Sequence, residues 1–208
     1  MASSKNAKKI IIIVATCAAI AVGITFLYYS TQQANINYYK GHHLFLKGKY
    51  VSAISYYEKA LEIDPSKIKA LREIAYSYMW TERPEKAVEY FGRALVLKPE
   101  EYELKKSLAE TLSWQKNYQK AIALYEEVIA VRGDAESEKR LAEVYIWKGD
   151  TEKAKEILKK YMDRFPLDTD ARLLWGKTLL YSENKEDKKE AAKVFEELIK
   201  EEESAPED

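Results

Sequence analysis

The chain has 208 residues, of which 47% are hydrophobic and 33% are charged, with 34 Lys and Arg against 34 Asp and Glu. Its single cysteine, Cys17, excludes an intrachain disulfide framework and a cysteine-based zinc cluster, since both need at least two thiols of one chain. Without the three lysines among the first nine residues, 31 basic and 34 acidic side chains remain. This leaves no excess positive charge to neutralise phosphates, so we expect no nucleic acid partner.

The first apolar segment runs from Ile10 to Tyr29, 20 residues without a charge. At about 1.5 Å per residue, a helix of this segment is about 30 Å long, the thickness of a bilayer core. Three lysines precede it and no Lys or Arg follows before Lys40, so the positive-inside rule places the amino terminus in the cytoplasm. We expect a cytoplasmic basic tail at residues 1–9, a single membrane anchor at 10–29 and a short linker at 30–33. The rest of the chain is then periplasmic, on the outer side of a bacterial inner membrane, or lies in an ER-type lumen in a eukaryote.

Two other interpretations of this segment stay open. A cleaved signal peptide usually has an apolar region of about 7–15 residues, and this run is longer. A lipoprotein signal would acylate Cys17, but Thr16 stands where a smaller residue is expected, and apolar sequence continues for ten residues beyond the cysteine. The length favours an uncleaved anchor, with Cys17 as a small polarizable side chain inside it.

The remainder of the chain repeats with a period of about 34 residues. Small residues recur at separations of 34, 34, 33 and 34, at Gly41, Ala75, Ala109, Ala142 and Gly176. Alanines with a bulky residue four positions later recur in the same order, at Ala53, Ala87, Ala121, Ala154 and Ala191. Pro65, Pro99 and Pro166 close three of the units. Residues four apart share a helical face, and Pro ends a helix, so each unit is expected to be a pair of helices.

This pattern resembles the tetratricopeptide repeat, a helix-turn-helix unit of 34 residues. The resemblance implies an all-α chain, in which an amino-terminal transmembrane helix is followed by a right-handed superhelix of about five repeats. We assign the repeats to residues 34–67, 68–101, 102–134, 135–168 and 169–202, and an acidic tail to residues 203–208.

The two terminal repeats depart from the pattern. The first has Asn37 and Lys40 where the family usually has large apolar residues. The fifth lacks the closing Pro, and its Ala191 follows Ala154 by 37 residues, which predicts a longer inner loop. Its last helix is predicted from Lys188 to Glu203 with a polar outer face, as a terminal repeat requires.

The sequence has no motif for catalysis. It lacks a phosphate-binding Gly-x4-Gly-Lys-Ser/Thr loop, a His-Glu-x-x-His pair and a Gly-x-Ser-x-Gly turn. The only histidines, His42 and His43, are adjacent, and adjacent helical side chains point in different directions, so we interpret them as solvent-facing rather than as metal ligands. We expect neither an enzyme nor a metal or cofactor site.

In the family, positions 2, 5, 9, 12 and 13 of the first helix of each repeat line a concave groove where peptides or partner helices dock. Here position 13 holds three of the four tryptophans and position 5 holds a ladder of basic residues. The resemblance therefore implies a partner-binding groove of Arg72, Tyr76, Trp80, Lys106, Trp114, Lys139, Trp147 and Tyr181. The tryptophans have two interpretations: they anchor a partner, or they pack between adjacent helices and stiffen the superhelix.

The function that we expect is a membrane-anchored scaffold that recruits protein partners of a membrane complex, in the assembly of a cell-envelope or secretion complex. A translocon-associated chaperone is a related alternative. A glycan-handling module of an exopolysaccharide synthesis or export system is a second one, because a row of aromatic rings suits stacking on sugars. Self-association through a hydrophobic end or the groove is a third.

Overall fold

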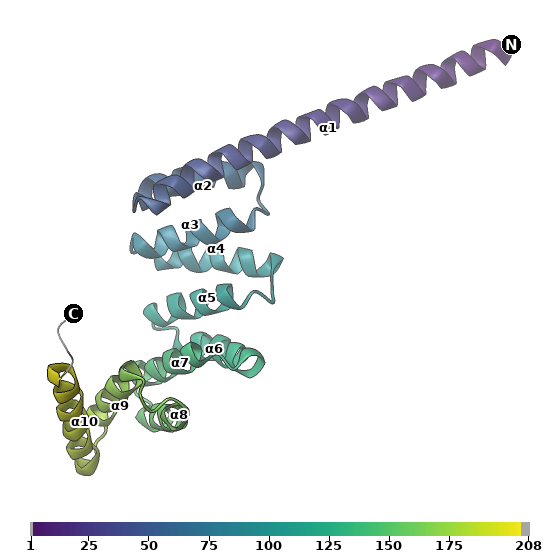
Figure 1. The fold of residues 1–208 in the computed structure, drawn as a ribbon. Helices are drawn as coiled ribbons and strands as arrows, with labels where there is room; N and C mark the ends of the chain where they lie inside the picture. Colours follow the sequence, from purple (N-terminus) through teal and green to yellow (C-terminus); the bar gives the residue numbers. More distant parts are fainter. Residues whose placement is uncertain (1, 205–208) are drawn as a thin grey trace. The chain divides into compact units, whose positions relative to one another are not determined.

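The computed structural model describes residues 2–204, with side chains from residue 13 onward (Figure 1). All secondary structure in this range is helical, which confirms the predicted all-α class. The helices are α1 (Ala2–Leu46), α2 (Tyr50–Ile63), α3 (Ile68–Trp80), α4 (Pro84–Leu97), α5 (Tyr102–Trp114), α6 (Tyr118–Arg132), α7 (Ala135–Lys148), α8 (Thr151–Arg164), α9 (Thr169–Tyr181) and α10 (Lys185–Ser204). Each predicted repeat contains two helices, which we call helix A and helix B, and the carboxy-terminal part of α1 is helix A of the first repeat.

The chain forms two compact bodies, which we describe separately. The amino-terminal body, to Arg83, contains α1, α2 and α3, and the carboxy-terminal body, from Pro84, contains α4 to α10.

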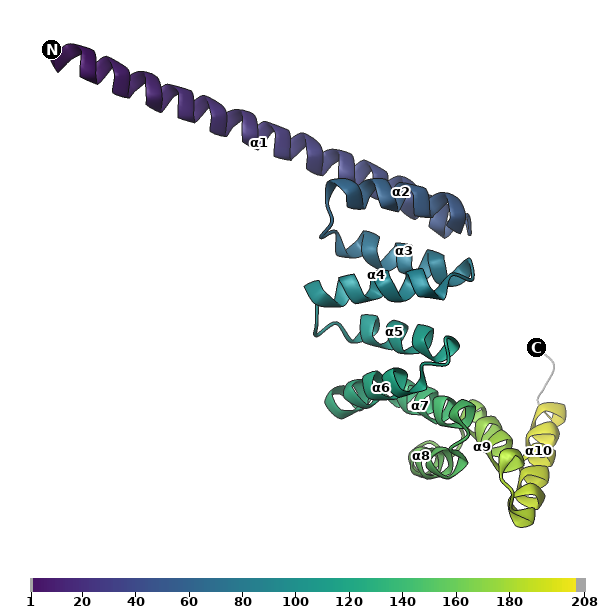
Figure 2. The same ribbon diagram turned by 180° about the vertical axis from the view of Figure 1, so that it is seen from behind.

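In the amino-terminal body, α2 packs against the carboxy-terminal part of α1 and against α3 (Figures 1 and 2). The buried face of α1 includes Ala34, Tyr38 and Gly41. A Cβ atom at Gly41 would lie 2.7 Å from the ring of Tyr57, so only glycine permits this approach. The two columns of the sequence repeat, small residue and bulky residue, therefore meet where helix A and helix B cross. Gly176 and Phe195 meet in the same way in the last repeat, where a Cβ atom at Gly176 would lie 2.8 Å from the ring of Phe195.

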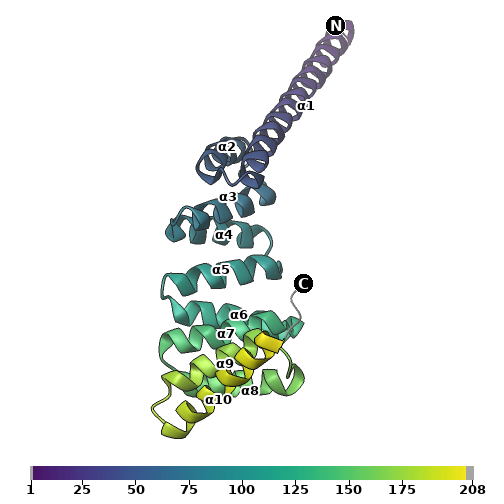
Figure 3. The ribbon, with the colours of Figure 1, turned by 60° about the vertical axis from the view of Figure 1, so that its left-hand side comes forward.

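The long first helix continues without a break from the apolar segment into the first repeat (Figure 3). Residues 30–33, the predicted linker, are helical and belong to α1. The described side chains before Ser30 are exposed in the chain itself. Ile13–Leu46 is the one described segment that is long and apolar enough to cross a membrane, with a mean hydropathy of 1.8 over 18 residues. A signal sequence near the amino terminus meets the same criterion.

The turns between helix A and helix B share one backbone conformation. Gly48, Glu82, Lys116 and Gly149 occupy equivalent places in four repeats, and all have positive φ, between 57° and 87°. This left-handed conformation is free for glycine but costs a residue with a Cβ about 1 kcal/mol. Glu82 and Lys116 therefore hold a strained backbone that the repeat requires.

The carboxy-terminal body has a continuous core between its helix pairs. Ala121 and Tyr125 of α6 pack with Leu112 of α5 and with Leu141 and Val144 of α7. At the end of this body, α10 buries only Ala191, and its polar residues Lys189, Glu190, Glu196, Glu197 and Lys200 are exposed, as expected for a terminal helix. Residues 203 and 204 of the predicted tail belong to α10, and residues 205–208 lie outside the described range.

Candidate partner-binding groove

In the carboxy-terminal body, helix A of three successive repeats lies side by side, with α7 in contact with both α5 and α9. Five of the residues that the sequence analysis assigns to the groove lie on these helices: Lys106 and Trp114 on α5, Lys139 and Trp147 on α7, and Tyr181 on α9. The other three, Arg72, Tyr76 and Trp80, lie on α3 of the amino-terminal body.

A pocket of about 290 Å³ opens between α7 and α9. Lys139 lines it, together with Glu136, Arg140, Glu143, Asp170 and Leu173. Lys139 belongs to the groove predicted from the sequence, whereas Arg140 does not, because Arg140 lies outside the helix positions that line the groove in the family. The pocket carries charges of both signs, so it is polar without a strong net charge.

The aromatic column is half open. Trp114 and Trp147 are 48% and 49% exposed, and Tyr181 at the end of the column is 69% exposed. Trp114 and Trp147 line a small cavity together with Glu110, Tyr125 and Arg140. In the amino-terminal body, Trp80 is 62% exposed and stacks on Tyr50, with ring centroids 6.1 Å apart. Each of these rings is thus partly covered by the chain and partly accessible.

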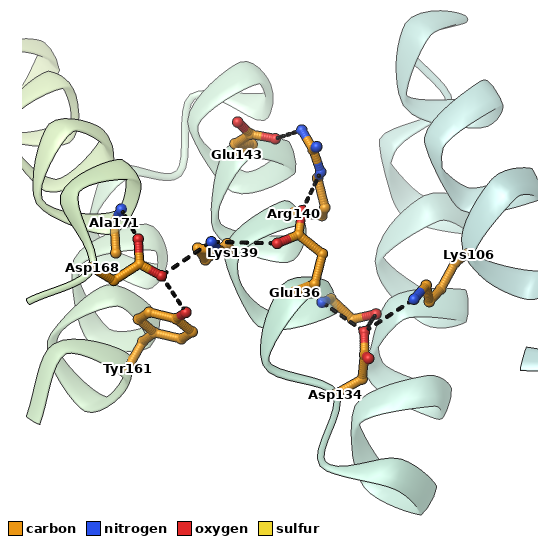
Figure 4. A network of polar contacts seen from close by, with 10 residues as sticks. Lys106, Asp134, Glu136, Lys139, Arg140, Glu143, Tyr161, Asp168 and Ala171 are labelled. Carbon is orange, nitrogen blue, oxygen red and sulfur yellow. Dashed lines mark hydrogen bonds and ion pairs between the residues drawn. The ribbon is translucent and has the colours of Figure 1, made fainter. Parts of the chain in front are cut away.

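The basic ladder is neutralised within the chain (Figure 4). Lys106 Nζ lies 3.6 Å from Asp134 Oδ2 and 3.2 Å from Glu103 Oε1. Lys139 Nζ lies 3.1 Å from Asp168 Oδ2 and 3.3 Å from Glu136 Oε2. These lysines connect each helix A to the start of the next one, so their charge is not free to attract an acidic partner.

The two aspartates also cap helices. Asp134 Oδ2 accepts hydrogen bonds from the backbone N–H and the hydroxyl of Ser137, at 2.9 Å and 2.6 Å. Asp168 Oδ1 accepts from the backbone N–H of Ala171 at 2.9 Å, and Oδ2 accepts from the Tyr161 hydroxyl at 2.6 Å. An Asp directly before a helix, with its carboxylate on an otherwise unpaired N–H, is a standard N-cap. The sequence contains this signal, but nothing in it indicates that the same carboxylate also binds a lysine of the preceding repeat.

The capping arrangement changes the acidity of these carboxyl groups. Partial burial disfavours the Asp168 carboxylate, but the hydrogen bonds from Tyr161, Ala171 and Lys139 outweigh burial and lower its pKa to about 2. Burial likewise opposes the charge of Asp134, while Ser137 and Lys106 stabilise it, and its pKa is lowered. Both groups are therefore ionised at neutral pH.

Arg72 differs from the two lysines of the ladder. Among the described residues, no carboxylate lies within ion-pair distance of its guanidinium. Its charge is therefore not neutralised by an ion pair within the described residues.

A buried carboxylate, which the sequence analysis does not identify, ties the amino-terminal body together. Glu73 of α3 is 7% exposed. Its Oε1 accepts a hydrogen bond from the Tyr38 hydroxyl at 2.9 Å, and its Oε2 accepts from the Tyr57 hydroxyl at 2.5 Å. His42 Nδ1 lies 2.8 Å from the same Oε2, so the interpretation of His42 as a solvent-facing side chain is wrong, whereas His43 is exposed. Burial, and then the hydrogen bonds to Glu73, raise the pKa of Tyr38 and of Tyr57.

Within residues 13–204, no group of three or more His, Cys, Asp or Glu is placed to hold a metal ion.

Comparison with known proteins agrees with this geometry. Models described as tetratricopeptide repeat match residues 34–67, 72–137 and 115–177. None of the curated proteins matches the chain.

Several solved structures are similar to it. The crystal structure of MamA protein has a TM-score of 0.71 and 26% identity, and the match covers 83% of this chain and 93% of that one. MamA from Desulfovibrio magneticus RS-1 has a TM-score of 0.75 and 21% identity, with 84% and 98% covered. The structure of YrrB, described as a repeat protein with an unusual peptide-binding site, has a TM-score of 0.64 and 21% identity, with 79% and 84% covered.

Proposed function

The chain belongs to the tetratricopeptide repeat family, and on this basis we propose that it is a protein–protein interaction scaffold that holds a partner peptide or helix against its helix A groove. The observation that carries the proposal is the half-open aromatic column of Trp114, Trp147 and Tyr181 beside the pocket between α7 and α9. Exposed aromatic rings on a rigid surface are the side chains that most often anchor protein interfaces. A peptide-binding site in the similar protein YrrB supports the same mode.

The internal ion pairs refine what the partner must offer. Since Lys106 and Lys139 are held by Asp134 and Asp168, acidic groups on the partner gain little from them. The partner is therefore anchored by apolar or aromatic side chains at Trp114 and Trp147.

We propose further that α1 anchors the scaffold in the membrane, with the amino terminus in the cytoplasm and the repeats on the outer side. The exposed apolar side chains between Ile13 and Tyr29 support this, since no described residue of the chain covers them. An anchor concentrates the groove at the membrane and suits a scaffold for a cell-envelope or secretion complex.

Photo-cross-linking tests the groove. A photoreactive residue replaces Trp114 or, in a second variant, Trp147, in the full chain in cells, and a third variant carries it at exposed Glu197 as the control. The expected result is one discrete protein adduct shared by positions 114 and 147 and missing at 197. Adducts of equal yield at all three positions, or none from the groove in folded protein, would contradict the proposal. Tryptophan quenching by soluble oligosaccharides, without a protein adduct, would favour the glycan-handling alternative.

Cysteine labelling tests the topology. Asn184→Cys and Ser4→Cys are made separately in a Cys17→Ala background and treated with a membrane-impermeant maleimide on intact spheroplasts. We expect labelling at position 184 and protection at position 4. The reverse pattern would place the repeats in the cytoplasm, and a mature protein that lacks residues 1–29 by mass spectrometry would show a cleaved signal instead of an anchor.

A further inference from the structure

One face of the first helix A is exposed to solvent, although the equivalent face of helix A is buried in every later repeat. We call it the bare face. Positions 3 and 10 of each repeat are fully buried in repeats two to five, at Ala70, Ser77, Leu104, Thr111, Ser137, Val144, Ala171 and Thr178. In α1 the same positions hold Ile36, which is 45% exposed, and His43, which is also exposed. Position 6 is buried at Glu73 and Ser107 and partly exposed at Arg140 and Leu174, whereas Tyr39 is 64% exposed. Within residues 2–204, each later helix A follows a helix B, whereas the first helix A continues from the apolar part of the same helix α1.

The bare face of α1 is apolar. Ile36, Tyr39 and Leu46 are spaced by three and seven residues, so they form one stripe along the helix, and Leu46 is 69% exposed. Repeat arrays normally end in a polar face, because each repeat buries its apolar surface only against a neighbour. The opposite end of this array follows that rule with α10, and the end formed by α1 does not. The amino-terminal end of the array thus leaves apolar side chains of α1 exposed.

Residues 30–63 hold four lysines and two acidic residues, Glu58 and Glu62, so the surroundings of this face carry a net positive charge. Residues 30–57 contain no Asp or Glu, but they contain Lys40, Lys47 and Lys49. Lys59 of α2 and Lys40 of α1 lie over the ring of Tyr56, at 5.4 Å and 5.9 Å from its centroid. Within residues 13–204, none of these four lysines has a carboxylate within 4.0 Å, in contrast to the paired Lys106 and Lys139 of the groove.

From these observations we propose that the outward face of α1, formed by Ile36, Tyr39, His43 and Leu46, binds an acidic amphipathic helix of a partner protein. Apolar residues of that helix, three and four apart, pack on Ile36, Tyr39 and Leu46 in the way that a preceding helix B packs in a repeat array. Its carboxylates face Lys40, Lys47 and Lys59, which supply both attraction and register. Leu46 holds position 13 of its repeat, a groove position in the family, whereas Ile36 and His43 hold positions 3 and 10, which are not groove positions. The inference rests on these two positions and does not depend on the groove.

The distance of the lysines from the membrane surface favours a protein helix over anionic lipid as the ligand of this face. Lys40 lies eleven residues beyond Tyr29, the end of the apolar segment, which is about 16 Å along a straight helix. The Debye length at physiological ionic strength is about 8 Å, so a membrane surface at Tyr29 exerts little force on Lys40 and less on Lys47.

Peptide binding to the full chain, reconstituted in nanodiscs of phosphatidylcholine, tests the proposal. The probes are two fluorescent peptides of the same composition, each of Leu, Glu and a few Ala. One places Leu at every third and fourth position, and the other distributes the same residues without helical periodicity. Fluorescence anisotropy gives the two dissociation constants. We expect the amphipathic peptide to bind at least about tenfold more tightly than its scrambled counterpart, a difference of about 1.4 kcal/mol.

The variants locate the site. Tyr39→Glu, and separately the double reversal Lys40→Glu and Lys47→Glu, should each weaken binding of the amphipathic peptide about tenfold or more. Lys200→Glu on α10 is the matched charge reversal and should change nothing. Trp147→Ala reports whether the peptide also contacts the groove. Circular dichroism confirms that each variant is folded, and the lysine reversal concerns exposed side chains only.

Three results would overturn the proposal. Equal binding of both peptides would mean that charge alone attracts them. Loss of binding in Trp147→Ala but not in Tyr39→Glu would place the peptide in the groove, which would support the proposed function while this inference fails. An oligomer in sedimentation velocity that Tyr39→Glu dissociates would mean that a second copy of the chain occupies the face.

Discussion

Lys139 in the middle of the candidate groove binds Asp168, the residue that caps the next helix A, with 3.1 Å between Nζ and Oδ2. Lys106 and Asp134 repeat this relationship one repeat earlier, at 3.6 Å. The side chains that sequence reasoning assigns to partner binding thus also fix the spacing of the helices that carry the groove. The link between groove and stability leads to the first prediction.

Asp168→Asn should destabilise the carboxy-terminal body at neutral pH, and the effect should disappear in acid. The pKa of Asp168 is about 2 in the folded chain against an ordinary value of 3.8, so its carboxylate contributes stability above about pH 4 that is lost as the pH falls towards 2. The expected loss at pH 7 is about 2 kcal/mol. Urea unfolding at several pH values measures it. Asp163→Asn on exposed α8 is the control, and an equal loss in that variant would refute the assignment.

Glu73→Gln should destabilise the amino-terminal body by about 1–3 kcal/mol, because the amide presents one acceptor oxygen where the carboxylate presents two to Tyr38, Tyr57 and His42. Glu73→Ala should cost more, since it leaves all three donors without their acceptor. Glu62→Gln on the exposed face of α2 serves as the matched control. A Glu73→Gln variant as stable as Glu62→Gln would show that the cluster contributes nothing.

The same cluster should appear in an alkaline titration. Because burial and Glu73 raise the pKa of Tyr38 and Tyr57, these two hydroxyls should stay protonated at a pH where exposed tyrosines such as Tyr39 have ionised. Absorbance of tyrosinate near 295 nm follows the ionisation. Tyr38→Phe and Tyr57→Phe should remove signal only from the late phase, and removal from the early phase would contradict the structure.

Lys116→Gly should stabilise the chain by about 1 kcal/mol, because Lys116 has a φ of 60° that glycine adopts without a steric cost. Ala123→Gly in the exposed interior of α6 provides the contrast, with an expected loss of about 1 kcal/mol. Thermal or urea unfolding of the two variants measures both effects. Destabilisation by both substitutions would mean that the turn carries no strain.

Trp147→Ala should cost less than about 2 kcal/mol, since about half of the ring is already exposed. Tyr125→Ala, which empties a site in the core between α5, α6 and α7, should cost about 3–5 kcal/mol. Similar losses in the two variants, measured by urea unfolding, would mean that the tryptophan is a core residue and that the groove is not its place of action.

The fold could be predicted because the residues that pack between helices recur in the sequence at the repeat period. The spacing identifies the columns that contain Gly41 and Gly176, and Tyr57 and Phe195, and the structure shows that these columns are in contact. The hydrogen bonds of Tyr38 and Tyr57 to Glu73 could not be predicted. Position 6 holds an acidic residue in one repeat only, and the donors to Glu73 lie 16 to 35 positions away in the sequence. The ion pair between Lys139 and Asp168 could not be predicted for a similar reason. The repeat period places each residue on its helix, but the distance from a lysine to the capping aspartate of the next repeat depends on how the helices pack.

The unbroken course of α1 also has a consequence for orientation. Each residue of an α-helix turns the chain by about 100° and advances it by about 1.5 Å. In a membrane, the direction in which the amino-terminal body faces is therefore set by the number of residues between the apolar segment and Ala34. One residue added at position 30 would swing this body through about a quarter of a circle while moving it hardly farther from the lipid, so two proteins with identical repeats could face different neighbours.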